Sequence, residues 1–172
     1  RWTMKTLIYC YRSGWMNNAL GLALAGIVAR PLTCPPLTAE TFPYERLGEA
    51  ELIYIALHGS PRARVLHGDE QIPALALDRV KAGPRLDGAI VVLEGCYQAE
   101  TLFPAAFLGR GVRAVFASPE RTFDRRWGLG AAGKAGLEIV RRVRAGLEPD
   151  VAARDSGFTA FVGRDEINGG FV

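Results

Sequence analysis

Five short runs of apolar residues constrain the fold of this chain more than any other feature of its sequence. The runs are KTLIYCY (5–11), AELIYIAL (50–57), GAIVVLEG (88–95), VRAVFAS (112–118) and FTAFVG (158–163). Runs that are apolar at consecutive positions are typical of strands buried on both faces. Because stretches with helical patterns separate them, the sequence predicts an α/β fold in three layers, with helices on both faces of a mostly parallel central sheet.

Helical patterns occupy most of the segments between these runs. They are expected at 17–30, 73–83, 99–111 and 128–147. Pro73 stands near the first turn of the second helix, where proline is tolerated, whereas the third helix has to accommodate Pro104. The Pro-rich stretch RPLTCPPLTAETFP is expected to be a loop or at most an edge strand, because proline cannot donate a hydrogen bond to a neighbouring strand.

Length and composition fit one globular domain. The chain has 172 residues, of which 49% are apolar, so it can bury a full core, and we expect a single domain over residues 1–172. Its 21 basic and 18 acidic residues leave a net charge of +3, which is too small an excess to indicate a nucleic-acid partner. The densest basic cluster, at Arg141, Arg142 and Arg144, is interpreted as the solvated face of a helix.

The cysteines and the N-terminal segment bear on localisation. The three cysteines are Cys10, Cys34 and Cys96. Their odd number and irregular spacing favour a reducing compartment over a disulfide framework, and they imply no metal site, so no cofactor is expected. The apolar part of segment 16–30 is shorter than the roughly 18 residues of a membrane span, and Arg12, Asn17 and Asn18 interrupt any signal-peptide pattern. We therefore expect a cytoplasmic protein without a membrane partner, with its natural start near Met4 or within a longer chain.

The tips of two of these runs carry the residues that bear most directly on function. The second run ends in His58 and Gly59 and the third in Gly95 and Cys96, and 38 positions (96 minus 58) with one helix separate histidine from cysteine. That separation fits neighbouring parallel strands, whose carboxyl ends share one edge of the sheet. A thiol and an imidazole at that edge match the nucleophile and base of a cysteine hydrolase. The backbone N–H groups of Gly59 and Cys96 are then candidate donors to an oxyanion.

Each of these residues also has a purely structural interpretation. Free cysteine is among the most buried residue types, and a His-Gly pair can cap a turn. Taken singly, Cys96 and His58 favour that interpretation, but together, at equivalent strand ends, they favour chemistry. Cys96 also precedes the helix expected at 99–111, whose amino end would favour a thiolate.

The two tip motifs resemble a known family. LIYIALHGS followed by IVVLEGCYQAET resembles the two signature blocks of the caspase-like (clan CD) cysteine peptidases, most of all their bacterial CHAT-domain branch. The stretches FLGRGVRAVFASPERTFD and FTAFVGRDE are similar to later blocks of CHAT domains. Over roughly residues 50–165, the resemblance implies a caspase-like, flavodoxin-related sandwich and a bacterial thiol protease of the endopeptidase type. It makes Cys96 the nucleophile and His58 the base, with the N–H groups of Gly59 and Cys96 as the oxyanion hole.

The resemblance also indicates the substrate. The position two before the nucleophile lines the pocket for the residue that precedes the cut, and here it is Glu94, which would favour Lys or Arg by charge pairing. Arg12 stands where caspases and legumain carry a pocket arginine, and a pocket holding both charges would instead prefer a neutral amide such as Asn. The favoured interpretation of Arg12 is nevertheless an ordinary surface arginine, so Lys or Arg is the first expectation for the substrate. The expected partner is a protein or peptide substrate, with a regulatory partner or an adjoining domain in addition. Arg-rich processing or docking sites are candidates at Arg121, Arg125 and Arg126.

Three alternatives belong to other functional classes. A catalytically silent CHAT-like domain would serve as a scaffold or interaction domain, because such domains are often joined to protein-interaction repeats. A flavodoxin-like ligand-binding domain would have the same arrangement of strands and helices. The pattern GLGAAG (Gly128, Gly130, Gly133) matches a dinucleotide-binding fingerprint, but the preceding strand ends near Ser118, about ten residues too early for a tight strand-to-helix turn.

Overall fold

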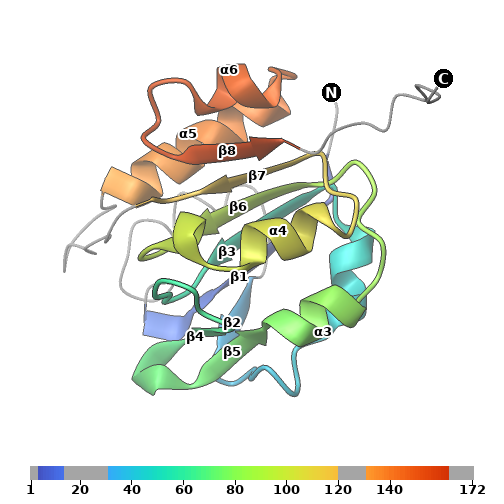
Figure 1. The fold of residues 1–172 in the computed structure, drawn as a ribbon, viewed down its shortest axis with the longest axis vertical. Coiled ribbons are helices and arrows are strands. Elements are labelled where there is room, and N and C mark those ends of the chain that lie inside the picture. Colours follow the sequence, from blue (N-terminus) through green and yellow to red (C-terminus); the bar gives the residue numbers. More distant parts are fainter. Residues whose placement is uncertain (1–3, 14–30, 120–130, 163–172) are drawn as a thin grey trace, which may run out of the picture.

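A six-stranded sheet forms the centre of the protein (Figure 1). The structure is a computed structural model, and it describes residues 4–13, 31–119 and 131–162. The strands follow the spatial order β2-β1-β3-β6-β7-β8. Their bounds are β1 Thr6–Tyr11, β2 Leu32–Cys34, β3 Leu52–Ala56, β6 Ile90–Glu94, β7 Ala114–Ala117 and β8 Thr159–Val162. Neighbouring strands pair in parallel except for β8, which runs antiparallel to β7.

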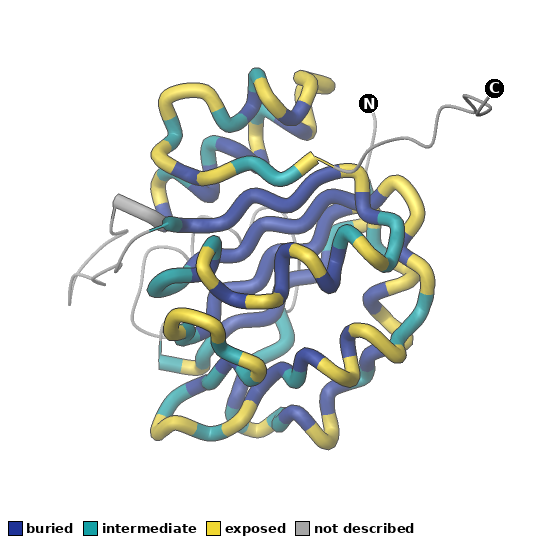
Figure 2. Tube along the Cα trace, viewed as in Figure 1, coloured by how far each residue is buried: buried dark blue, intermediate teal, exposed yellow. Residues whose placement is uncertain are grey.

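Helices cover both faces of this sheet. The helices α3 (Leu77–Ala82) and α4 (Phe103–Leu108) pack on one face, and α5 (Ala131–Arg144) and α6 (Pro149–Ala153) pack on the other. Figure 2 shows the central strands buried along their length, whereas the outer sides of the helices are exposed. The predicted α/β architecture with a mostly parallel, covered sheet is therefore confirmed.

The central strand β3 shows why its sequence is apolar at every position. All five of its residues are buried, because successive side chains point to opposite faces and each face is covered by helices. Ile53 and Ile55 join the core beneath α3 and α4, while Tyr54 and Ala56 join the core beneath α5. Burying side chains of this size contributes roughly 1.5–3 kcal/mol each, so the two cores together fix the position of the strand.

The helix predicted at 73–83 is wrong in its first part. Pro73–Ala76 forms strand β5, which pairs antiparallel with β4 (Val65–His67), and α3 begins only at Leu77. The stretch has a helical pattern, but its pairing with β4 overrides that local preference. Pro73 is compatible with a strand because it stands at the first residue of β5.

The helix predicted at 99–111 begins later than expected. A 3₁₀ turn, η3 (Gln98–Glu100), follows the Cys96 segment, and α4 begins at Phe103 with Pro104 in its first turn. The amino end of α4 thus lies seven positions beyond Cys96 (103 minus 96), with η3 between them, and Cys96 does not directly precede the helix as predicted.

The sequence did not predict three further elements, and some predictions lie outside the described residues. The unpredicted elements are the 3₁₀ helices η1 (Tyr44–Glu49) and η2 (Asp69–Gln71) and the short helix α6. The helix predicted at 17–30 and the residues Arg121, Arg125, Arg126, Gly128 and Gly130 lie outside the described part of the chain. Within that part, none of the helices has the length and apolar character needed to cross a membrane.

Candidate active site

The two predicted motifs leave the sheet side by side. Strands β3 and β6 pair in parallel up to Ala56 and Glu94, and the N–H of Leu57 donates a 3.2 Å hydrogen bond to the Glu94 carbonyl oxygen. Gly59 packs closely on the segment after β6, since a Cβ at Gly59 would lie 2.7 Å from the Cys96 carbonyl oxygen. The structure therefore brings the main chain of the His-Gly motif against that of the Gly-Cys motif.

The turn that carries Cys96 has an unusual backbone. Gly95 has φ +145° and Tyr97 has φ +54°, so residues with positive φ flank the cysteine on both sides. A Cβ at Gly95 would overlap the carbonyl oxygen of Leu57, which explains why only glycine fits there. A left-handed non-glycine residue such as Tyr97 costs about 1 kcal/mol or more, and such strain is concentrated at functional sites.

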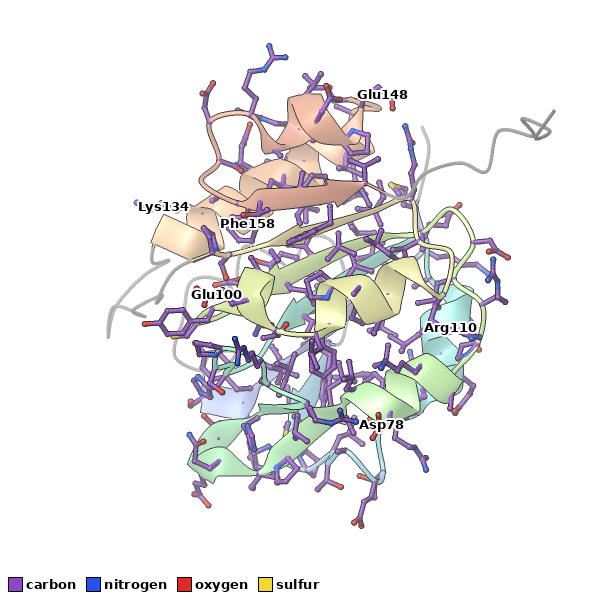
Figure 3. The ribbon with its side chains drawn as sticks, in the orientation of Figure 1. Asp78, Glu100, Arg110, Lys134, Glu148 and Phe158 are labelled. Atoms are coloured by element: carbon purple, nitrogen blue, oxygen red, sulfur yellow. The ribbon has the colours of Figure 1, made fainter. Side chains whose placement is uncertain are left out.

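Strand β7 holds this turn from the other side. The Ser118 hydroxyl, at the end of β7, donates to the Gly95 carbonyl oxygen, and the Ala99 N–H donates a 3.0 Å hydrogen bond to the Ser118 carbonyl oxygen. Hydrogen bonds on both sides of Cys96 fix the path of the turn. In Figure 3, Glu100 of η3 marks this carboxyl edge of the sheet, and Arg110, just beyond α4, lies at the opposite edge.

Gln98 braces both strand tips, and the sequence did not single it out. Its side chain is fully buried, and Nε2 donates a 2.8 Å hydrogen bond to the Leu57 carbonyl oxygen. The same nitrogen would lie 3.0 Å from a Cβ at Gly59, so the amide fills the space beneath the two motifs. Among the described residues, its Oε1 has no hydrogen-bond partner. One feature of the sequence could have indicated Gln98. It is an amide residue directly after Gly95-Cys96-Tyr97, the segment that follows the apolar strand.

His58 lies in a partly buried environment made by three elements. Its backbone N–H and C=O exchange 2.8 and 2.9 Å hydrogen bonds with His67 of β4. Its ring lies 4.6 Å, centroid to centroid, from the ring of Tyr11 at the end of β1. Burial lowers the pKa of His58 below its usual 6.5, Asp69 acts in the opposite direction, and His67 adds to the lowering. At neutral pH the imidazole is therefore mainly neutral and can accept a proton.

Asp69 ties the β4–β5 hairpin to the end of β1. Its Oδ2 accepts a 2.6 Å hydrogen bond from the Ser13 N–H, and its Oδ1 accepts one from the Ser13 hydroxyl. Ser13 and Asp69 could not be linked from the sequence, because 56 positions separate them. The only signal was a second His-Gly pair, His67-Gly68, directly before Asp69.

Of the three thiols, Cys96 is the most accessible. Cys10 and Cys34 are buried, whereas Cys96 is partly exposed. Burial, with a smaller contribution from the carboxylates of Glu94 and Asp69, raises the pKa of Cys10 to about 12. Burial also raises the pKa of Cys34. A thiol with a raised pKa carries little thiolate at neutral pH, so Cys10 and Cys34 are poor nucleophiles.

Glu94 is the last residue of β6, and it lies on the face of the sheet that α5 covers. It is only 7% exposed, and the Tyr54 hydroxyl donates a hydrogen bond to its Oε2. Burial raises the pKa of Glu94 from 4.5 to about 7, and the Tyr54 hydrogen bond offsets part of that effect. Gly136 of α5 lies directly against the Tyr54 hydroxyl, which leaves no room there for a side chain. Arg12 is exposed. Among the described residues, the Glu94 carboxyl group accepts its hydrogen bond from Tyr54.

Neither a scan against models of known protein families nor a search of curated proteins finds a match to this chain. The resemblance to caspase-like peptidases therefore rests on the sequence motifs alone. Within the described ranges, no group of three or more His, Cys, Asp or Glu side chains is arranged to hold a metal ion.

Proposed function

We propose that this protein is a caspase-like cysteine endopeptidase in which Cys96 is the nucleophile and His58 the general base. The observation that supports the proposal most is the pairing of β3 with β6, which sets His58-Gly59 against Gly95-Cys96 at one edge of the sheet. Two further observations agree with it. The turn around Cys96 is strained and braced, and Cys96 is the partly exposed thiol of the three.

The proposed reaction follows the chemistry of a Cys-His dyad. Neutral His58 takes the proton from the Cys96 thiol, and the thiolate attacks the carbonyl carbon of the scissile peptide bond. The oxyanion that forms accepts hydrogen bonds from the N–H groups of Gly59 and Cys96. Protonated His58 then gives its proton to the leaving amine, which leaves a thioester on Cys96. A water molecule that transfers a proton to His58 hydrolyses the thioester, and the free thiol returns.

Gly59 suits the role of an oxyanion donor. It has no side chain to block the approach of a carbonyl group, and its Cβ position is already crowded by the Cys96 main chain. Among the described residues, its N–H donates to no backbone acceptor. An available N–H next to the nucleophile is the donor that a developing oxyanion requires.

For the substrate we propose a protein or peptide with Lys or Arg before the cleaved bond, recognised by Glu94. The pKa of about 7 means that the Glu94 carboxyl gains its charge as the pH rises through neutrality. Preference for a basic side chain should therefore be stronger at pH 8 than at pH 6. If Arg12 shares the pocket, a neutral amide such as Asn will be preferred at both pH values, so comparison of Lys, Arg and Asn peptides decides between the two.

The test is turnover of a library of fluorogenic peptides that differ in the residue before the cut. Wild-type protein should cleave part of the library, with products that place the cut after Lys or Arg, and Cys96→Ala should cleave none. Cys10→Ala is the matched control, because it removes a buried thiol outside the proposed mechanism. Cleavage by Cys96→Ala would refute the assignment of the nucleophile. A folded wild-type protein that cleaves no peptide would point to the silent scaffold instead.

A further inference from the structure

The β4–β5 hairpin contacts the proposed base from a side that the two strand tips do not reach. His67 and His58 form an isolated antiparallel bridge with both backbone hydrogen bonds made. Residues directly opposite one another in such a bridge carry their side chains on the same side, about 5 Å apart at Cβ. The two imidazoles are therefore neighbours, and the main chain of His58 cannot shift without breaking two hydrogen bonds.

The same hairpin brings a carboxylate to this region. Asp69 follows β4 by two positions, and it accepts hydrogen bonds from both the N–H and the hydroxyl of Ser13. Ser13 lies two positions beyond Tyr11, whose ring contacts His58. Asp69 thus holds the end of β1 in place, and with it the aromatic ring against the base.

We propose that the β4–β5 hairpin positions the catalytic base, with His67 fixing the main chain of His58 and Asp69 stabilising its protonated form. Asp69 and His67 are positioning residues in this proposal, because they act through His58. The proposal takes its catalytic meaning from the proposed peptidase function. Its structural content, the effect of the hairpin on His58, stands whether or not the protein cleaves peptides.

The charges around His58 act in opposite directions. The titratable groups placed around it are Tyr11 from β1 and His67 and Asp69 from the hairpin, and the main chain of Cys96 lies against the neighbouring Gly59. Burial lowers the pKa of His58 most, the Asp69 carboxylate raises it, and the His67 imidazole lowers it. A base whose protonated form is stabilised by a fixed carboxylate can both accept and return a proton near neutral pH.

The experiment is an NMR titration of the histidine ring protons in Cys96→Ala protein, which needs no activity. The chain has two histidines, so His67→Gln leaves a single imidazole and assigns the His58 signal. Asp69→Asn keeps the shape but removes the charge; its amide oxygen can still accept from the Ser13 N–H, and its NH2 group can donate to the Ser13 hydroxyl oxygen. We expect Asp69→Asn to lower the pKa of His58 and His67→Gln to raise it.

The matched control is Asp78→Asn, which removes an exposed carboxylate of α3 that pairs with Arg64 (Figure 3). It should leave the His58 titration unchanged. An unchanged or raised pKa of His58 in Asp69→Asn, or an unchanged or lowered one in His67→Gln, would overturn the proposal. Since the two variants are independent, failure of one to fold still leaves the other as a test.

Kinetics then separate this proposal from the proposed function. If wild-type protein cleaves peptides, Asp69→Asn should lower kcat by about tenfold or more with KM little changed, because proton transfer and not binding is impaired. The acid limb of its kcat/KM profile should move toward lower pH with the pKa of His58. If no peptide is cleaved but both titrations shift as expected, only the peptidase function fails. If peptides are cleaved but neither titration shifts, only the role of the hairpin fails.

Discussion

Glu94 should make the stability of this protein depend on pH, and Glu94→Gln should remove that dependence. The pKa of the carboxyl is 4.5 in the unfolded chain and about 7 in the folded protein. Below pH 4.5 both states hold the proton, so the ionisation of Glu94 does not change the free energy of unfolding. Between pH 4.5 and 7 the unfolded chain loses its proton while the folded protein keeps it, so the free energy of unfolding falls. Above pH 7 both states are ionised, so the loss in the free energy of unfolding stays constant.

The size of this effect follows from the two pKa values. A difference of about 2.5 units (7 minus 4.5) at 1.36 kcal/mol per unit gives about 3 kcal/mol. Glutamine stays neutral at every pH, and its amide oxygen can still accept the Tyr54 hydrogen bond. The stability of Glu94→Gln relative to wild type should therefore rise by about 3 kcal/mol between pH 4.5 and pH 8.

Urea denaturation at intervals of half a pH unit measures this difference directly. Glu100→Gln is the matched control, since Glu100 is an exposed glutamate near the same edge of the sheet (Figure 3), and it should show no such rise. A difference between Glu94→Gln and wild type that stays constant over the whole range would refute the reasoning. It would mean that the folded protein holds Glu94 ionised, with a cation close by.

Three further predictions concern the strand tips. In urea denaturation, Gly95→Ala should lower the free energy of unfolding by more than Gly88→Ala. Both glycines have positive φ, but of the two only a Cβ at Gly95 would overlap other atoms. Equal losses in the two variants would contradict this. Gln98→Ala should cost about 1–3 kcal/mol, since it removes the hydrogen bond to Leu57, and an unchanged Tm would count against a bracing role. His58→Ala should abolish peptide turnover with an unchanged circular dichroism spectrum, whereas loss of folding would favour a structural role.

The strands of the sheet could be predicted because burial on both faces leaves a local mark in the sequence. Every residue of β3 and β6 is buried, and both strands are continuous apolar runs except for Glu94 at the end of β6. The tip residues follow directly from the ends of those runs. The placement of His58 and Cys96 at one edge then follows from the parallel pairing of adjacent strands. The first step needs only residues close together in the chain, and the second needs only the expectation that β3 and β6 are neighbouring parallel strands.

The hairpin and its contacts could not be predicted in the same way. Strand β4 has only three residues. The residues of β5 share one continuous helical sequence pattern with α3, which follows it directly. Neither strand therefore has the length or the alternation of a recognisable strand. The hydrogen bonds between Asp69 and Ser13 join segments 56 positions apart, and they depend on how the hairpin folds onto the sheet. Gln98 was missed for a related reason, because its role depends on the carbonyl oxygen of Leu57 on another strand.

The measurement that tests the central claim most directly is covalent labelling by a thiol-directed peptide electrophile, followed by intact-mass and peptide-mapping mass spectrometry. We predict a single adduct on Cys96, which is absent in Cys96→Ala, retained in Cys10→Ala and Cys34→Ala, and formed much more slowly in His58→Ala. An adduct that persists in Cys96→Ala, or a Cys96 that reacts equally fast with and without His58, would contradict the claim that these two residues form a catalytic dyad.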